Sequence, residues 1–442
     1  MPRLILVYAS MGRAPGRKFV RSWQQEPLAM GVLAALTPSE WEITFFDDRV
    51  EEIDYSARAD MVGISIETYS ARRGYQIAAE FRKRNIPVIF GGYHATLCPD
   101  EALEHADAVC VGEAEGVWPE ILADAANGCL KGRYERGEFA ALERIRVDRS
   151  LFKGKRYMPL SLIETGRGCP LKCNFCSISA FYQATYRRRP AEDIVRELAE
   201  VEHDWIFFVD DNFTGNVDGA RELFAAVKPY RKKWITQTSV TGLKDREFVK
   251  EMAESGCIGV LIGFESLNQD NLGDMKKPVN KREEFSAILK NLREAGIFVY
   301  GTFVFGYPHD TVDLYRQTVD FAVKEKMFIV AFNHLVPFPG TPLYAELACK
   351  GRMRYDKWWL SSDYYFGEVP FNPERMTAGE VENSCLQARK AFYSLSSIIR
   401  RATDRQCNCG SPSRMLFYAQ FNRMLRREIT EKRGVLLGFK GD

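Results

Sequence analysis

The sequence predicts an α/β protein with three parts: a doubly wound parallel-sheet domain, a partial (β/α)6 barrel of the TIM type, and a mainly helical C-terminal region. The first observation behind this prediction is that short apolar runs, typical of strands buried on both faces, alternate with helical patterns over residues 1–345. The second is that no convincing strand pattern follows them. We place the parts at 1–126, 127–157 (a linker), 158–345 and 346–442.

The first part reads as alternating strands and helices in chain order. Its expected strands are 4–8, 41–46, 61–66, 87–90 and 108–111, with helices over 27–36 and 70–84. A parallel sheet of this kind binds ligands beyond the carboxyl ends of its strands. The polar, weakly periodic stretch 127–157 has scattered glycines and is expected to link the domains.

The second part repeats the alternation about six times at roughly 30–45-residue spacing, as a barrel or part of one does. Its expected strands are 160–163, 205–209, 234–235, 259–262, 299–305 and 329–332, separated by helices over 190–201, 218–227, 245–255, 281–295 and 311–325. Functional groups are then expected at the carboxyl ends of the strands. In the last part, 377–394 and 413–432 have helical patterns, and the rest is rich in aromatic residues that suit packing over the barrel mouth as a lid.

Composition excludes several classes of protein. With 46% hydrophobic and 27% charged residues, the 442-residue chain is neither disordered nor fibrous. No apolar run approaches the ~18 residues of a membrane helix, and the first apolar run is too short for a secretory signal. The net charge of +2 provides no overall field for nucleic acid or an anionic membrane. We therefore expect a cytoplasmic protein with a small-molecule substrate and neither a nucleic-acid nor a membrane partner.

Three of the eleven cysteines form a tight motif, Cys169-x3-Cys173-x2-Cys176. Three thiolates on one loop can reach three corners of a cubane iron–sulfur cluster. A structural zinc site would normally need four protein ligands, and no fourth lies nearby. The alternative of three buried structural cysteines suits this loop poorly, because its glycine and proline would pack badly in a core. The spacing therefore indicates a cluster with one iron free to bind a substrate.

This motif, with the aromatic Phe175 before its last cysteine, resembles the signature of the radical S-adenosylmethionine (SAM) superfamily. The resemblance implies that the cysteines hold a 4Fe–4S cluster whose open iron is chelated by the amino and carboxylate groups of SAM. It implies an electron donor such as flavodoxin or ferredoxin, and cleavage of a carbon–sulfur bond of the sulfonium. A 5′-deoxyadenosyl radical, which abstracts hydrogen, is the usual result.

Later strand ends carry polar groups in the order that this resemblance implies. Asp210, Asp211 and Asn212 are expected near the SAM amino group, and Glu265 near its ribose. The segments 301–306 and 334–337, with Gly306 and His334, are expected to flank adenine. The alternative for any one strand-end Asp is that it caps the next helix.

The first part resembles the cobalamin-binding domain that often precedes such a barrel. The resembling segments are 91–96, with Gly91, Gly92 and Tyr93, and 111–116, with Glu113, and these residues are the candidates for the cobalamin face. Many such domains supply a His to cobalt from the loop after the first strand, but residues 9–17 contain none. The domain is therefore expected either to hold cobalamin without a protein lower ligand, or to hold none and wall the active site.

Three further features have two interpretations each. The basic loop 11–23 could bind an anionic group or be a solvated loop, and the arginines of 186–190 could clamp a carboxylate or form a surface charge run. Cys407 and Cys409 could form a second iron–sulfur site, hold a soft acceptor on a lid over the barrel, or have no chemical role.

These observations lead to three functional hypotheses. The first is cobalamin-assisted radical alkylation, in practice methyl transfer to an unactivated carbon. The second needs no cobalamin and moves the 3-amino-3-carboxypropyl group of SAM to a soft acceptor, such as trivalent arsenic on Cys407 and Cys409. The third is a non-catalytic carrier or sensor that stores a cluster and cobalamin.

Overall fold

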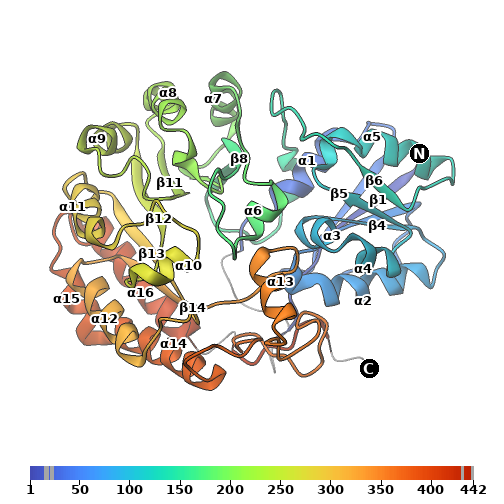
Figure 1. The fold of residues 1–442 in the computed structure, drawn as a ribbon. Coiled ribbons are helices and arrows are strands. Elements are labelled where there is room, and N and C mark those ends of the chain that lie inside the picture. The colour runs from blue at the N-terminus through green and yellow to red at the C-terminus, as the bar shows by residue number, and fades with distance from the viewer. Residues whose placement is uncertain (14–18, 20–23, 430–432, 440–442) are drawn as a thin grey trace.

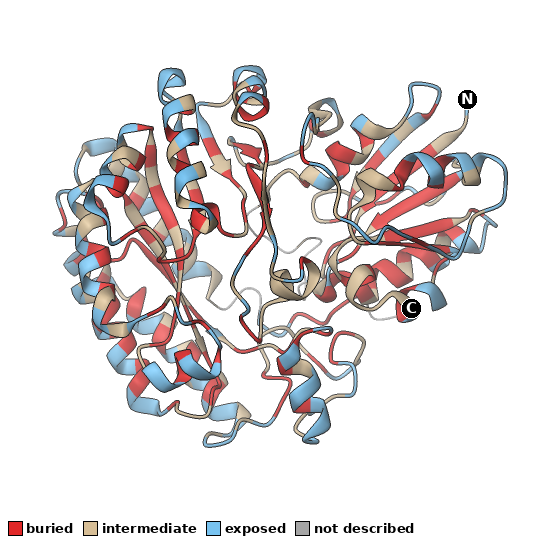
Figure 2. Ribbon diagram, turned by 45° about the horizontal axis from the view of Figure 1, so that its top comes forward, coloured by how far each residue is buried: buried red, intermediate tan, exposed pale blue. Residues whose placement is uncertain are grey.

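The computed structural model describes all residues of the 442 except 14–18, 20–23, 430–432 and 440–442. Two parallel sheets stand beside each other, each flanked by its own helices (Figure 1). The strands of both sheets are largely buried, and exposed residues gather on the outer helices (Figure 2). The predicted fold class is confirmed. None of the described helices is both long enough and apolar enough to span a bilayer.

The first sheet has the order β2-β1-β3-β4-β5-β6, with every pair parallel. Its strands are β1 (Arg3–Tyr8), β2 (Glu42–Asp47), β3 (Met61–Ser65), β4 (Val88–Gly91), β5 (Ala108–Val111) and β6 (Arg133–Glu135), and its main helices are α1 (Leu28–Leu36), α2 (Ala71–Arg82), α3 (Tyr93–Leu97), α4 (Pro99–Glu104) and α5 (Trp118–Ala126). Side chains alternate along β1: Leu4 and Leu6 enter a core shared with α1 and α5, whereas Ile5 and Val7 enter a core shared with α2. Both faces are therefore buried, as the continuous apolar run predicts.

One strand lies within the stretch expected as a linker. β6 pairs with β5, and its Tyr134 is buried. Further along, Phe152 is buried in the same core as α1. Much of 127–157 therefore belongs to the first domain. This strand is hard to predict from the sequence, because a three-residue edge strand needs only one apolar side chain.

The second sheet has the order β14-β13-β12-β11-β10-β7, which is an open, partial barrel of six parallel strands. The strands are β7 (Ser161–Ile163), β10 (Trp205–Phe208), β11 (Lys233–Thr238), β12 (Cys257–Glu265), β13 (Phe298–Phe305) and β14 (Ile329–His334). The helices between them are α7 (Ala191–Glu200), α8 (Val217–Val227), α9 (Arg246–Glu254), α10 (Gln269–Asp274), α11 (Phe285–Glu294) and α12 (Val312–Lys324). A small antiparallel hairpin, β8 (Gly166–Gly168) with β9 (Tyr186–Arg188), leaves the barrel after β7 and encloses α6 (Ser177–Phe181).

The C-terminal region divides between the two domains rather than forming one lid. Its helices α14 (Ala378–Phe392), α15 (Leu395–Ala402) and α16 (Pro412–Glu428) continue the barrel core beyond β14, whereas Trp358 and Trp359, which follow α13 (Pro342–Cys349), enter the core of the first domain. The chain then returns to the first domain, where Leu437 is fully buried and the Gly438 amide donates to the Met11 carbonyl at 2.8 Å.

Candidate functional site

The cysteine motif forms the loop between β8 and β9, at the carboxyl end of the barrel. Gly168, which precedes it, has φ +83°, and a Cβ there would collide with the Thr185 carbonyl. The missing side chain lets the two strands of the hairpin close tightly behind the loop. Cys169 and Cys173 are buried, and Cys176 is half-buried. Burial raises the pKa of Cys173 to about 12, so a thiolate there needs a positively charged partner.

The three thiols suit a cluster better than a single ion. Within the described residues, no three His, Cys, Asp or Glu side chains converge closely enough to hold one metal ion. A four-iron cluster takes each thiolate on a different iron, so its ligands stand apart. The thiols are still near neighbours, since Cys169 and Cys176 each raise the pKa of Cys173 by charge repulsion. The donor set therefore fits the 4Fe–4S cluster that the motif predicts.

Two groups from the barrel approach this loop. Asn212 Nδ2 donates to Cys169 Sγ at 3.4 Å, while its Oδ1 accepts from the Ser239 amide at 2.9 Å. The buried ammonium of Lys277 lowers the pKa of Cys173 by its charge and pairs with Glu265 Oε1 at 2.6 Å. Glu265 therefore lies beside the cluster loop, and its place near the SAM ribose stays a prediction; its partner Lys277 was not predicted. Nothing in the sequence around Lys277, which follows a short helix, indicates that it pairs with Glu265.

The two aspartates of the first barrel corner have structural partners. Asp210 accepts from the Thr165 amide and hydroxyl at 2.7 and 2.5 Å, and burial raises its pKa to about 7. Asp211 accepts from the Gly168 amide at 2.9 Å, and burial raises its pKa to about 6. Both carboxyl groups thus hydrogen-bond the segment that leads into the cysteine loop. Of the three residues predicted at this corner, Asn212 is the one whose side chain forms a described hydrogen bond to a cluster cysteine.

Of the remaining predicted SAM residues, Gly306 and His334 lie at the carboxyl ends of later strands, whereas Phe175 lies in the cysteine loop. Phe175 packs against the barrel core, and the Gly306 amide after β13 donates to Asp310 at 2.6 Å. His334 ends β14, and burial lowers its pKa to about 4, so its ring is neutral. Its Nε2 is buried and has no hydrogen-bond partner among the described residues. An unsatisfied buried nitrogen at this end of the barrel is available to a ligand.

A cavity of about 440 Å³ lies between the two domains. The first domain contributes the carboxyl ends of β1, β3, β4 and β5, together with α1, and the barrel contributes β7, β8 and α6. All four candidates for the cobalamin face line it: Gly91, Gly92, Tyr93 and Glu113. Gly112, also in the wall, has φ +82° and no atom within 4 Å of a Cβ, so this stretch of wall is open. The cavity is thus at the edge where a doubly wound sheet binds its ligand.

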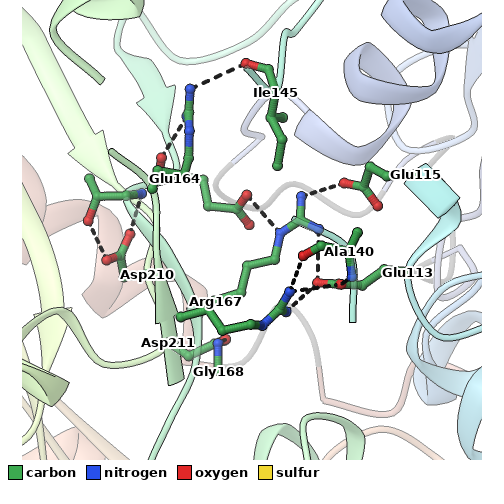
Figure 3. A network of polar contacts seen from close by, with 12 residues as sticks. Glu113, Glu115, Ala140, Ile145, Glu164, Arg167, Gly168, Asp210 and Asp211 are labelled. Atoms are coloured by element: carbon green, nitrogen blue, oxygen red, sulfur yellow. Dashed lines mark hydrogen bonds and ion pairs between the residues drawn. The ribbon is translucent and has the colours of Figure 1, made fainter. Parts of the chain in front are cut away.

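Buried ion pairs close one side of this cavity and join the domains (Figure 3). Glu113 accepts from Arg167 at 3.0 Å and from Arg187 at 2.5 Å, and Arg167 also pairs with Glu115 and Glu164. The charges of the two arginines hold the pKa of Glu113 below its usual range despite burial. Arg187 is one of the arginines expected to clamp a carboxylate. The carboxylate that it binds in the structure is that of Glu113.

No histidine lines the cavity among the described residues. His94, next to Tyr93, is fully buried and contacts Glu101 through Nε2 at 3.0 Å and Thr68 through Nδ1 at 3.4 Å. A cobalamin held in this cavity would therefore receive no imidazole ligand from the described lining residues. Of the basic loop 11–23, Arg17, Lys18 and Arg21 lie outside the described residues.

The tail cysteines lie far from this arrangement. Cys407 is buried, and its Sγ donates to the carbonyls of Arg293 and Ile297 at 3.4 and 3.5 Å. These carbonyls precede β13, so the pair is at the amino end of the barrel, opposite the cysteine loop. Burial raises the pKa of Cys407 to about 12, which keeps it a thiol. The expected lid carrying Cys407 and Cys409 over the mouth is thus corrected: hydrogen bonds from Cys407 and Asn408 to backbone carbonyls hold this loop at the amino end of the barrel.

The fold and the cysteine loop define a radical SAM enzyme joined to a cobalamin-binding domain. The chain matches the radical SAM superfamily over residues 163–322 and the B12 binding domain over 25–122. It is 33% identical over 360 residues to bacteriochlorophyllide d C-8(2)-methyltransferase of Chlorobaculum tepidum, covering 76% of this chain and 79% of that protein. It is 28% identical over 421 residues to the C-12(1)-methyltransferase of the same organism, covering 92% and 90%.

Solved structures share the whole architecture. The methyltransferase TsrM from Kitasatospora setae superimposes with a TM-score of 0.66 at 18% identity, covering 89% of this chain and 83% of its own. The cobalamin-dependent radical enzyme OxsB gives 0.68 at 14%, covering 97% and 72%. The chain belongs to the cobalamin-dependent radical SAM methyltransferases. Its cofactors are a 4Fe–4S cluster, SAM and cobalamin, which answers the question that the missing histidine left open.

Proposed function

We propose that the protein methylates an unactivated carbon atom of a small organic substrate. The observation that carries this proposal is the shared wall between the two cofactor regions. Arg167 lines the interdomain cavity and stands two residues before Cys169, and Phe181 and Tyr182 line it five and six residues after Cys176. A ligand in the cavity thus lies against the same hairpin that carries the cluster. When bound, the cluster supplies an electron to SAM and cobalamin supplies a carrier for the methyl group.

The roles of the chain's own residues follow from their contacts. Cys169, Cys173 and Cys176 hold the cluster, and the Lys277 charge offsets their negative charge. Glu265 and Lys277 offer SAM a paired anion and cation at the end of β12.

Aromatic side chains from both domains form one wall of the cavity. The ring of Tyr93 lies 4.7 Å from that of Phe181, and Tyr182 lies 4.6 Å from Phe181, so residues of both domains form one aromatic wall. A wall of this kind protects a radical from water and from stray hydrogen donors.

The two other hypotheses have less support. Transfer of the carboxypropyl group to an acceptor held by Cys407 and Cys409 requires that pair to face the SAM site, and it lies at the other end of the barrel. A non-catalytic carrier is inconsistent with membership of a family of transferases. The two Chlorobaculum tepidum relatives are named for methylation of bacteriochlorophyllide d, so we take a large cyclic tetrapyrrole as the first substrate class to test.

The test uses the full chain, reconstituted anaerobically with iron, sulfide and cobalamin. Incubation with a chemical reductant and SAM labelled in its methyl group should give a substrate carrying that label on carbon when bacteriochlorophyllide d or a related tetrapyrrole is present. The corrinoid absorption spectrum should remain with the protein after gel filtration. A labelled carboxypropyl product, or turnover without bound corrinoid, would overturn the proposal.

A further inference from the structure

The charge of the chain is unevenly distributed. Residues 383–429, all of them described, contain nine basic side chains and two acidic ones, a net charge of +7 in a chain whose total is +2. Of the two acidic side chains, Asp404 is buried and Glu428 is half-buried. The exposed basic residues are Lys390, Arg400, Arg405, Arg423, Arg426 and Arg427. Four of these arginines lie on α15 and α16, Arg405 lies in the loop between them and Lys390 lies on α14, so the exposed charge of α15, α16 and their connecting loop is positive.

The same two helices expose apolar side chains. Of the ten large hydrophobic residues that are exposed among the described residues, five lie here: Leu395, Ile399, Met415, Leu416 and Met424. Leu395 and Ile399 are 63% and 67% exposed and share one stripe of α15, four residues apart. On α16, Leu416 shares a stripe with Arg423 and Arg427 at spacings of seven and eleven.

The opposite faces of both helices are fixed to the protein. Arg401 of α15 is fully buried and donates to Asn422 of α16 at 2.9 Å, and Tyr418 donates to the Ile398 carbonyl at 2.8 Å. The outward stripes therefore cannot turn inward to hide their apolar groups. Figure 1 places α15 and α16 on the side of the barrel remote from the first domain.

We propose that the outward surface of α15 and α16 docks the protein on an anionic lipid membrane. Aliphatic side chains among arginines match an interface in which apolar groups enter the acyl boundary and cations meet lipid phosphates. A second copy of this chain is a poor occupant, because two surfaces of the same strong charge repel each other. Nucleic acid would leave five apolar side chains uncovered.

An acidic electron-donor protein is also a poor occupant. Loop 404–410, between the two helices, lies against the carbonyls of Arg293 and Ile297 at the amino end of the barrel, whereas the cluster cysteines are at the carboxyl end. A donor on this surface would be separated from the cluster by the length of the barrel. A membrane there leaves the cofactor cavity uncovered.

Vesicle co-sedimentation of the full chain tests the proposal. The protein should bind vesicles of phosphatidylcholine mixed with phosphatidylglycerol, bind phosphatidylcholine alone far more weakly, and lose binding as salt rises. The triple variant Arg423→Gln, Arg426→Gln, Arg427→Gln should bind about a hundredfold more weakly, since each cation near an anionic surface contributes roughly fivefold. The matched triple variant Lys250→Gln, Lys290→Gln, Arg316→Gln, with the same loss of charge on other exposed helices, should bind as the native protein does.

A second variant addresses the apolar component. Leu395→Gln with Ile399→Gln changes two exposed side chains, so it should leave the unfolding temperature unchanged and weaken vesicle binding at least tenfold. Equal binding of neutral and anionic vesicles, or full binding by the arginine triple variant, would overturn the proposal. A dimer that this double variant abolishes, or tight binding of flavodoxin or nucleic acid without vesicle binding, would assign the surface to that occupant and overturn it equally.

Discussion

The two cysteine-bearing loops of this protein, 169–176 and 404–410, occupy opposite ends of one barrel and have opposite surroundings. The first is reached by the Lys277 ammonium and the Asn212 amide, which stabilise negative sulfur. In the second, Cys407 donates to two backbone carbonyls, which stabilises the protonated thiol. Close spacing of cysteines thus says that thiols are near one another, and the end of the barrel at which they lie decides what they can do.

The largest effect that separates the loops should come from removing the first set of thiols. Cys169→Ala, Cys173→Ala or Cys176→Ala should each abolish the visible iron–sulfur absorption and all SAM cleavage, because each thiolate holds one iron. Absorption spectra and product analysis under anaerobic conditions measure both. Cys129→Ala, at an exposed cysteine, is the control and should keep both the iron–sulfur absorption and SAM cleavage. Full SAM cleavage by any of the three variants would contradict the assignment.

The next effect concerns the ion pair beside the first loop. Glu265→Gln should keep the cluster but weaken SAM binding by about 1.5–3 kcal/mol, the range of a charge-assisted hydrogen bond. The dissociation constant of SAM, measured by equilibrium dialysis, gives the result. Lys277 loses its partner in this variant, which costs stability as well.

The double variant Glu265→Gln, Lys277→Met separates these two causes. In the protein without its cluster, where Cys173 is a neutral thiol, replacing both members of the buried pair should restore most of the free energy of unfolding, because neither charge of the pair remains. SAM affinity should stay low. Recovery of native SAM affinity in the double variant would limit the pair to a structural role.

A smaller effect is expected from the interdomain ion pairs behind the first loop. In the Glu113→Gln variant, Arg167 still pairs with Glu115 and Glu164. Arg187, by contrast, loses the carboxylate with which it pairs in this network. The free energy of unfolding should fall by about 1–3 kcal/mol, and cobalamin should be lost more readily on gel filtration. Glu135→Gln, at a half-exposed pair on β6, should change neither quantity. Native cobalamin retention by Glu113→Gln would show that this wall does not hold the cofactor.

The smallest effect should come from the second loop. The double variant Cys407→Ser, Cys409→Ser should retain the cluster, SAM cleavage and product yield, because a serine hydroxyl can donate to the carbonyls that Cys407 uses. Its stability should fall by about 1 kcal/mol, measured by urea unfolding. Loss of product with an intact cluster would instead give this pair a part in the chemistry and break the contrast between the loops.

The sequence predicted what is local in the chain. The cysteine spacing and the apolar runs of the sheets each lie within a few residues, so they could be read directly. Arg167 and Glu113, by contrast, pair across 54 positions, and the Lys277 partner is known only once β12 and the segment after α10 are folded. The strand-end aspartates were found as a group, but their hydrogen bonds to Thr165 and Gly168 depend on tertiary packing.

Total charge was a poor guide to local charge. A net +2 led us to expect no anionic membrane partner, yet it is the sum of +7 in residues 383–429 and −5 elsewhere. Which arginines face outward follows from the packing of α15 and α16, which the sequence pattern alone does not fix.

The return of residues 435–439 to the first domain constrains when that domain can be completed. Leu437 is buried in the same core as Ile5 and Val62, and Gln76 Nε2 donates to the Phe439 carbonyl at 2.6 Å. During synthesis these residues leave the ribosome after the whole barrel, although domains usually fold in chain order. The cofactor domain would therefore wait, with part of its core uncovered, until its partner has been made. Loading with cobalamin is then expected to follow synthesis of the chain rather than accompany it.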